Sequence, residues 1–270
     1  SDTINFIGAR KEVIVSGGAI NSAQLLQLSG VGPSKILLSR GIPIKRDITG
    51  VGKNLRDHLA TRLTARAKNA QTINEMSRGI KLVKQMANYL IGRRSILSLG
   101  PTLVYCFWHS NESIKNNDLQ ISFTPASYNL GRQAILDRFP GFSIASWVQR
   151  PESSGWVNIK SADPFEKPVI QPNYLSAYED QRIAVDGIRL SRKLMHSKEL
   201  QPYFDAEVYP GDKFQSFEEL LEVARNRGNT AYHLVGTCRM GPKSDPTAVV
   251  DKNLKVYGFK NLRVVDASIM

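Results

Sequence analysis

The chain has 270 residues, of which 41% are hydrophobic and 8% aromatic, so it can bury a substantial core in one or two domains. Its formal net charge is +12 at pH 7, but the lysines and arginines are scattered singly or in pairs such as Arg93 and Arg94, which favours a solvated surface over a nucleic-acid interface. No window approaches about 18 consecutive apolar residues, so we predict no transmembrane helix.

The first segment, residues 11–26, predicts a short apolar strand, a glycine turn and the start of a helix. A turn at Gly17 and Gly18 would let backbone N–H groups and the helix N-terminus face a phosphate or another polar group. The spacing is not G-x-G-x-x-G, so by itself it predicts strand-to-helix geometry rather than a nucleotide loop. A second, short helix is expected over residues 33–40.

A polar, glycine-punctuated loop follows at residues 50–58. Its side chains Asn54, Asp57 and His58 have two possible roles, because such residues either lie near a cofactor or satisfy backbone groups. The residues alone favour neither role.

The character of the chain changes at about residue 67. A basic segment over residues 80–90 predicts an amphipathic helix that packs by one face, since apolar residues recur there at helical spacing. These apolar residues are Ile80, Val83, Ala87 and Leu90. Alternating patterns then predict several strands of an antiparallel sheet with one face covered. The strands are expected at residues 104–108, 119–124, 142–149 and 156–160.

Two further helices are expected before the closing segment. Residues 179–195 predict a helix with one apolar stripe. The stripe consists of Ala184, Ile188 and Met195. Residues 216–227 predict another helix, because Ser216 suits its N-cap and Glu219 completes a capping box three residues later. Gly228 then suits the C-terminal end of that helix.

The last segment combines a histidine with an acid that ends a strand pattern. His233 can exchange a proton near neutral pH, although most single histidines are satisfied or surface imidazoles. Residues 262–266 predict a buried strand ending on Asp266, and an acid at the carboxyl end of a strand is well placed to meet a cofactor in an α/β sheet. Cys238 makes a Cys–His nucleophile pair an alternative, but such a cysteine is more often a buried small hydrophobe.

Four separated stretches resemble the glucose-methanol-choline (GMC) family of flavoprotein oxidoreductases. They are YHLVGTCRMG with its continuation to Met270 (residues 232–270), GGAINSAQLLQLSGVG (17–32), GVGKNLRDH (50–58) and KPVIQPNYL (167–175). These sequences resemble the C-terminal portion of the family and are most similar to its insect, glucose-dehydrogenase-like branch. Two positions depart from the family pattern: Ala23 stands where proline is common, and residues 151–156 lack the usual Ser-Arg-Gly sequence.

The resemblance implies a fold with α/β and α+β parts. Residues 1–66 would form part of a Rossmann-like FAD-binding domain, and residues 67–230 a substrate-binding domain with an antiparallel sheet covered by helices. Residues 231–270 would return to the FAD-binding domain. In the family a nucleotide loop lies further toward the N-terminus and a second catalytic His or Asn lies beyond the position of Met270, so we expect a fragment that is inactive alone.

The resemblance also implies FAD-dependent oxidation of the CH–OH group of an alcohol or sugar, with oxygen or a quinone as electron acceptor. His233 would be the general base while a hydride passes to flavin N5. Tyr232 would lie beside the flavin ring, and Asp266 and Ala267 would contact its ribityl–pyrophosphate region. The aromatic candidates for the wall of the substrate pocket are Phe123, Tyr128, Trp147 and Trp156.

The sequence is also compatible with functions other than alcohol oxidation. The chain could be a non-catalytic relative that keeps the GMC fold, or a lyase that shares it. Secretion is typical of the insect relatives and is favoured by the resemblance, although no leader is visible in the chain. The cysteines match no metal motif, so we expect no metal, and the scattered charge predicts no nucleic-acid partner.

Overall fold

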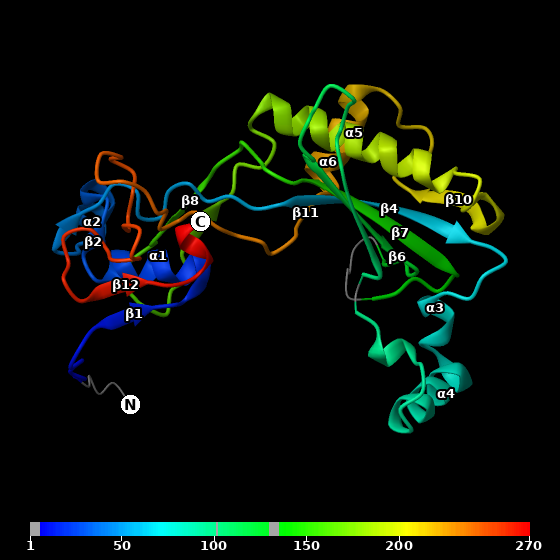
Figure 1. Ribbon diagram of the computed structural model, residues 1–270, viewed down its shortest axis with the longest axis horizontal. Coiled ribbons are helices and arrows are strands. Elements are labelled where there is room, and N and C mark those ends of the chain that lie inside the picture. The colour runs from blue at the N-terminus through cyan, green and yellow to red at the C-terminus, as the bar shows by residue number, and fades with distance from the viewer. Residues whose placement is uncertain (1–5, 101, 130–134) are drawn as a thin grey trace. The chain divides into compact units, whose positions relative to one another are not determined.

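The computed structural model describes residues 6–100, 102–129 and 135–270, which fold into two compact units (Figure 1). Unit 1 consists of Ser1–Asp57, Ser153–Ser176 and Tyr232–Met270. Unit 2 consists of His58–Glu152 and Ala177–Ala231. Each unit is therefore assembled from segments that are distant in the sequence.

Unit 1 is built on short strand pairs and helices. Its parallel pairs are β1 (Val13–Val15) with β12 (Leu262–Val264) and β2 (Val31–Gly32) with β3 (Arg46–Asp47), and its antiparallel pair is β8 (Trp156–Asn158) with β9 (Val169–Gln171). Its helices are α1 (Gly18–Leu28), α2 (Ser34–Ser39) and the 3-10 helix η3 (Ala267–Ile269). The strand, turn and two helices predicted at the start of the chain are thereby confirmed.

The core of unit 1 packs α1 against segments from later in the chain. Leu26 of α1 and Val264 of β12 are buried in one apolar cluster. Gln27, on the same helix, is also fully buried. Its Nε2 donates to the Val157 carbonyl over 2.9 Å, and its Oε1 accepts from the Ile159 N–H over 2.8 Å. Because a buried amide must be hydrogen-bonded, Gln27 fixes α1 against the β8 segment.

Unit 2 is organised around an antiparallel sheet of six strands, in the order β10-β4-β7-β6-β5 with β11 beside β4. The strands are β4 (Leu59–Ala67), β5 (Val104–Trp108), β6 (Leu119–Thr124), β7 (Gly141–Val148), β10 (Phe204–Tyr209) and β11 (Asn229–Thr230). The helices are α3 (Ile73–Met76), α4 (Gly79–Leu90), α5 (Tyr178–Met195), α6 (Phe217–Arg227) and the 3-10 helices η1 (Ile96–Ser98) and η2 (Gln201–Tyr203). Three strands predicted from alternation are confirmed as β5, β6 and β7.

Helix α5 covers one face of this sheet (Figure 1). Its residues Ala184, Ile188 and Met195 are buried, as the predicted stripe requires. A glycine is needed where the helix meets the sheet, because a Cβ atom at Gly187 would lie 2.8 Å from Ser146 Oγ. The expected antiparallel sheet with a helix on one face is confirmed.

The first change of unit falls after Asp57 and not after residue 66 as expected, whereas the boundary expected after residue 230 lies one residue from the change between Ala231 and Tyr232. β4 already begins at Leu59 and is hydrogen-bonded to β7, so the change of unit falls before this strand. The strand predicted at residues 156–160 also lies elsewhere than expected, because β8 pairs with β9 in unit 1. Backbone hydrogen bonds, rather than the order of segments along the chain, decide which sheet a strand joins.

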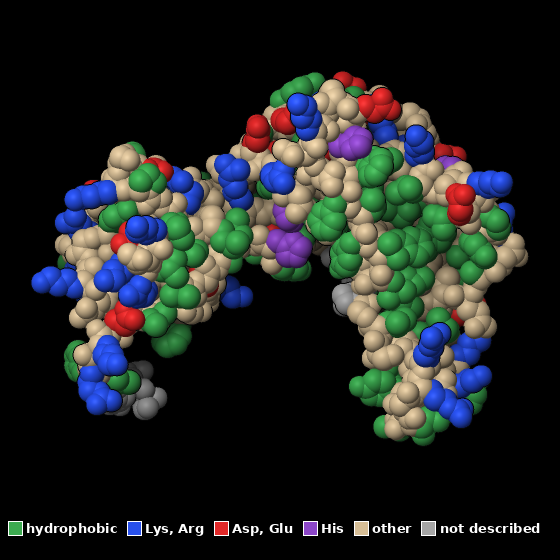
Figure 2. All heavy atoms as spheres, in the orientation of Figure 1, with side chains coloured by type: hydrophobic (Ala, Val, Ile, Leu, Met, Phe, Trp, Pro, Cys, Tyr) green, Lys and Arg blue, Asp and Glu red, His purple; other side chains and the backbone are tan. Residues whose placement is uncertain are grey.

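The amphipathic helix is confirmed as α4, but its predicted packing is wrong. Its apolar residues are exposed (Figure 2), with exposed fractions of 82% for Ile80, 58% for Val83 and 82% for Leu90. The polar side of the helix makes the contact instead, because Gln85 Oε1 accepts from the Ile96 N–H over 2.9 Å. Helical periodicity identifies an apolar side of a helix but not the element that covers it.

The capping box of α6 is confirmed. Ser216 Oγ accepts from the Glu219 N–H over 3.2 Å, and Glu219 Oε2 accepts from the Ser216 N–H over 2.9 Å. We expect Ser216→Ala to lower the free energy of unfolding by about 0.5–2 kcal/mol, because an N-terminal amide of the helix loses its acceptor. Urea unfolding followed by circular dichroism measures this loss. Arg225→Ala, at an exposed position of the same helix, is the control, and an equal loss there would contradict the capping role.

Candidate active site

The carboxylate of Asp266 follows β12 and meets the start of α1. Its Oδ2 accepts from the Gly18 N–H over 3.0 Å and from Ser22 Oγ over 2.5 Å. Its Oδ1 accepts from the Ser268 N–H over 2.8 Å and so caps η3. Burial by itself raises the pKa of Asp266, but these hydrogen bonds outweigh burial and hold the pKa below its ordinary value. Asp266 is therefore an ionised anchor between two distant segments.

The N-terminus of α1 borders open space beside this anchor. The helix has no side-chain cap of its own, so Asp266 supplies the negative charge that a helix N-terminus favours. Gly18 adopts a φ of +79°, a conformation that suits glycine, and a Cβ atom there would meet no described atom within 4 Å. Backbone donors at such a position can receive a polar or anionic group.

The segment that begins at the predicted base runs beside two other parts of unit 1. Arg56 and Val235 exchange backbone hydrogen bonds of 3.0 and 2.9 Å. Further along, the Cys238 N–H donates to the Ser268 carbonyl over 2.8 Å. The structure therefore brings the segment after the predicted base next to the closing residues that carry the anchor.

Asp57 fixes the backbone at His233. The side chain of Asp57 is buried, and its Oδ1 accepts from the His233 N–H over 2.9 Å. Its Oδ2 accepts from the hydroxyl of Tyr174. Asp57 comes from the loop at residues 50–58, Tyr174 from the stretch at 167–175 and His233 from the stretch at 232–270, so three of the stretches that resemble the GMC family meet here. Of the two roles open for Asp57 in the sequence, the structure shows the backbone-satisfying one.

The other two polar residues of that loop also make local contacts. Asn54 adopts a φ of +58°, which asparagine tolerates, and its carbonyl would lie 2.1 Å from a Cβ atom at Gly236. His58 belongs to unit 2, where its Nε2 lies 3.0 Å from the Gln149 carbonyl and its ring stacks on Trp147 at a centroid distance of 6.3 Å. The loop thus positions backbone in both units.

Tyr232 and His233 present their side chains to solvent in the described chain. Tyr232 is 78% exposed and adopts a φ of +61°, an outlier for a bulky side chain. The imidazole of His233 is exposed while Asp57 holds its backbone, and Ala267 is exposed as well. Strained backbone beside an accessible titratable group is an arrangement that clusters at functional sites.

Cys238 is an unfavourable nucleophile. The residue is fully buried, and burial raises the pKa of its thiol to about 12. A protonated thiol reacts poorly, which argues against the alternative of a nucleophile pair with His233.

Two residues that support the site, Ser22 and Tyr174, are not predicted by the sequence analysis. Tyr174 lies inside a stretch that resembles the GMC family, and that resemblance could have identified it. Nothing in the sequence distinguishes Ser22 from other serines near the start of a helix.

The four aromatic candidates for a substrate pocket do not line one pocket. Phe123 lies on the α5 side of the sheet, at an apolar cavity of about 280 Å³. Trp147 lies on the opposite face, because it pairs with Gln120 rather than with a residue of the Phe123 row. Tyr128 follows β6 in unit 2, whereas Trp156 lies on β8 in unit 1.

Two features are absent from the described ranges, a cluster of metal ligands and a membrane-spanning helix. Within residues 6–100, 102–129 and 135–270, no group of three or more His, Cys, Asp or Glu is placed to hold a metal ion. None of the helices in those ranges has the length and apolar character needed to cross a membrane.

Comparison with known proteins decides the family. Residues 1–60 and 151–270 match the N- and C-terminal models of the GMC oxidoreductases. The chain is also 38% identical over 262 residues to the oxygen-dependent choline dehydrogenase of Staphylococcus xylosus, a match that covers 96% of this chain and 46% of the relative. The chain belongs to the GMC oxidoreductase family. The resemblance is thus confirmed, while the insect glucose-dehydrogenase-like branch stays a prediction.

Solved structures of oxidases share this fold. A formate oxidase matches with a TM-score of 0.86 at 26% identity, covering 97% of this chain and 50% of that chain. An Aspergillus oryzae formate oxidase studied for modification of its FAD gives 0.86 at 27% identity, with the same coverage. Pyridoxine 4-oxidase from Mesorbium loti gives 0.78 at 26% identity, covering 96% and 46%. This GMC chain spans about half the length of the relatives that it matches.

Burial of Cys238 predicts slow alkylation. At pH 8, iodoacetamide should modify the exposed Cys106 at least about 10-fold faster than Cys238, because a thiol with a pKa near 12 forms little thiolate at that pH. Mass spectrometry of the native protein over time gives both rates, and Cys106→Ser isolates the reaction of Cys238. Fast labelling of Cys238 in the folded protein would restore the Cys–His alternative.

The hydrogen bonds of Asp266 predict a pH-dependent stability. Since the pKa of Asp266 is lower in the folded chain, its ionised form stabilises the fold above the unfolded pKa, and this contribution is lost as pH falls through the folded pKa. We expect Asp266→Asn to cost roughly 1–3 kcal/mol at pH 7 and less at pH 3. Urea unfolding at both pH values measures the difference. Asp205→Asn, at an exposed position of β10, is the control, and a cost of Asp266→Asn that does not change with pH would contradict the argument.

Proposed function

We propose that the full-length protein is an FAD-dependent oxidoreductase that oxidises the CH–OH group of a small alcohol or sugar. Membership of the GMC family supports this proposal, and the relatives are named choline dehydrogenase, formate oxidase and pyridoxine 4-oxidase. Because the chain spans 46% of the choline dehydrogenase, the activity is assigned to the whole protein. The inactivity of residues 1–270 alone, the use of oxygen or a quinone as acceptor, and secretion all stay predictions.

The observation that carries the proposal is the fixed backbone at His233. Asp57 lies 176 residues earlier, is buried, and accepts from the His233 N–H over 2.9 Å. Tyr174 donates to the same carboxylate and restricts its orientation. The backbone is thus held from one side while the imidazole stays accessible, as a general base requires.

The residues of unit 1 fit an FAD molecule. The N-terminus of α1 offers a positive helix end, and the open space beside Gly18 gives a polar group room to approach the backbone. We propose that this end of α1, with the exposed Ala267, faces the ribityl–pyrophosphate region. Asp266 acts as a positioning residue there, because three of its acceptor sites already hold α1 and η3. Tyr232, which is exposed, would lie beside the flavin ring.

The chemistry at His233 is a proton transfer. A ring nitrogen of the neutral imidazole takes the proton of the substrate hydroxyl as the C–O bond becomes a carbonyl. FAD, when bound, supplies the acceptor for the hydride that leaves the same carbon. The hydrogen bond from the His233 N–H to Asp57 keeps the base in place, and the left-handed backbone at Tyr232 sets the direction in which the segment enters the site.

We expect His233→Gln in the full-length protein to lower kcat by about 10²- to 10⁴-fold, because glutamine cannot accept the hydroxyl proton. Anaerobic bleaching of the flavin absorbance by an alcohol substrate gives the rate of reduction directly. His196→Gln, at an exposed position beyond α5, is the matched control and should keep the rate within about twofold. A His233→Gln protein that binds flavin and reduces it at the rate of the unsubstituted protein would contradict the assignment of His233 as the base.

A further inference from the structure

Helix α4 of unit 2 presents an apolar stripe to solvent. Ile80, Val83 and Leu90 are each more than half exposed, and Ala87 between them is exposed as well. Because these positions are spaced by three or four residues, their side chains lie along one side of the helix. Apolar side chains that gather on the outside of a protein mark a surface where a partner or a membrane binds.

The opposite side of α4 attaches the helix to unit 2. The Gln85 carbonyl accepts from Ser95 Oγ over 2.8 Å, and Gln85 Oε1 accepts from the Ile96 N–H over 2.9 Å. Leu82 and Asn88, three residues to either side of Gln85, are partly buried. The contacts of Gln85 therefore fix the rotation of the helix, and the fold itself turns the apolar stripe outward.

Positive charge accompanies the stripe. Residues 76–111 contain five Lys and Arg and no Asp or Glu, which gives this segment a charge of +5. The five are Arg78, Lys81, Lys84, Arg93 and Arg94. The exposed Lys84, Arg93 and Arg94 form no ion pair with any residue in the described ranges. Figure 2 shows hydrophobic and basic side chains together over α4.

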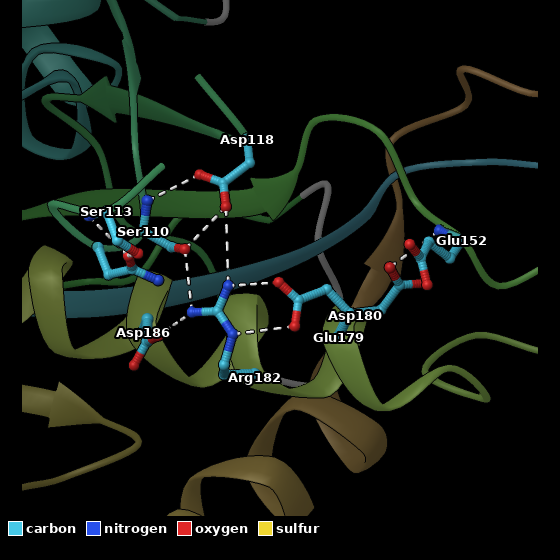
Figure 3. A network of polar contacts seen from close by, with 9 residues as sticks. Ser110, Ser113, Asp118, Glu152, Glu179, Asp180, Arg182 and Asp186 are labelled. Atoms are coloured by element: carbon cyan, nitrogen blue, oxygen red, sulfur yellow. Dashed lines mark hydrogen bonds and ion pairs between the residues drawn. The ribbon is translucent and has the colours of Figure 1, made fainter. Parts of the chain in front are cut away.

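A basic side chain of α5 shows a different arrangement. Arg182 lies 2.6 Å from Glu179 and 2.8 Å from Asp186, as Figure 3 shows. On α4, by contrast, Lys81 approaches Glu75 only to 3.9 Å. The charge of Arg182 is neutralised within unit 2, whereas the charge around α4 is balanced by ions of the solvent or by an anionic partner.

A second copy of the chain fits this surface poorly. In a symmetric pair the same surface of both copies would meet, which brings two sets of five positive charges together. A lipid surface matches both features of α4, since anionic headgroups attract the cations and the acyl region receives the apolar side chains. The helix has 12 residues, or about 18 Å, so it can lie on a bilayer but cannot span a hydrocarbon core of about 30 Å.

We propose that α4 is a membrane-surface helix that binds a bilayer containing anionic lipids. Ile80, Val83 and Leu90 enter the boundary between headgroups and acyl chains, while Arg93 and Arg94 meet lipid phosphates or carboxylates. The long stems of the basic side chains let their charges stay at the headgroups while the helix lies deeper. The inference concerns where the protein attaches and holds whether or not the proposed oxidation takes place.

Sedimentation with lipid vesicles tests the inference on the full-length protein. The vesicles consist of phosphatidylcholine alone or of phosphatidylcholine with about 30% phosphatidylserine, which adds a negative surface charge. We expect the partition coefficient to be at least about 10-fold higher for the anionic vesicles, because several cations meet that surface together. Added salt should reduce the difference, since it screens exposed charges.

The apolar stripe is tested by Val83→Gln combined with Leu90→Gln. Binding to the anionic vesicles should fall at least about 10-fold, because two apolar side chains no longer leave water. Leu38→Gln changes an exposed leucine on α2 in unit 1 and should leave binding within about twofold. Thermal unfolding shows that each variant is folded before it is mixed with vesicles.

The charge is tested by Arg93→Gln combined with Arg94→Gln. This pair should lower binding to the anionic vesicles about 10-fold and leave binding to neutral vesicles unchanged. Lys193→Gln combined with Lys198→Gln removes two exposed charges from the same unit and should have a much smaller effect. An equal loss in both pairs would make binding a property of net charge and would overturn the role of α4.

A fluorescent label on the stripe shows whether α4 itself meets the lipid. Ala87→Cys in a Cys106→Ser background places one accessible thiol there, because Cys238 is buried. An environment-sensitive dye on that thiol should shift its emission to the blue when anionic vesicles are added.

Four results would overturn the inference. The first is that the full-length protein binds no vesicles, and the second is that vesicles bind while the label on position 87 shows no shift. The third is a label whose emission is already blue without lipid and is unchanged by vesicles, which would mean that the rest of the full-length protein covers the stripe. The fourth is a dimer that Val83→Gln with Leu90→Gln dissociates, which would assign the stripe to a second copy.

Discussion

The carboxylate of Asp266 joins the end of the chain to its beginning. It accepts hydrogen bonds from Gly18 and Ser22, which lie 248 and 244 residues earlier, and from Ser268 two residues later. Because Gly17 has no side chain to cap α1, this distant acid satisfies the helix and remains ionised under the influence of its donors. The parallel pairing of β1 with β12 places the acid there, so a polar group at this helix end meets a fixed surface.

Elements with signals inside a few residues could be predicted from the sequence. Helix α6 was predicted correctly because Ser216 and Glu219 form a capping box that needs no other part of the chain. The strand β6 was predicted correctly because Leu119 and Ile121 alternate with polar residues and are buried. The family could be predicted because each of the stretches that resemble it is contiguous in the sequence. The apolar stripe of α5 could be predicted because its buried residues recur with the period of a helix.

Contacts between distant segments could not be predicted in the same way. The bond from the His233 N–H to Asp57 joins residues 176 apart, and no local pattern encodes it. The apolar side of α4 was visible, but the hydrogen bond of Gln85 turns the polar side of the helix toward η1. The residue pattern of β8 predicts a strand, but its pairing with β9 depends on residues that come later in the chain. In each case the missing information was the identity of the partner.

The groups that hold the backbone at His233 all come from unit 1. Asp57 accepts from the His233 N–H and from the Tyr174 hydroxyl, and Asp266 joins α1 to η3 in the same unit. The sheet of unit 2 is built from other segments of the chain. A fold divided in this way can keep one set of residues while the rest of the chain varies, because function depends on particular sites and not on the fold alone. Relatives that share the fold are accordingly named for choline, a cation, and for formate, an anion.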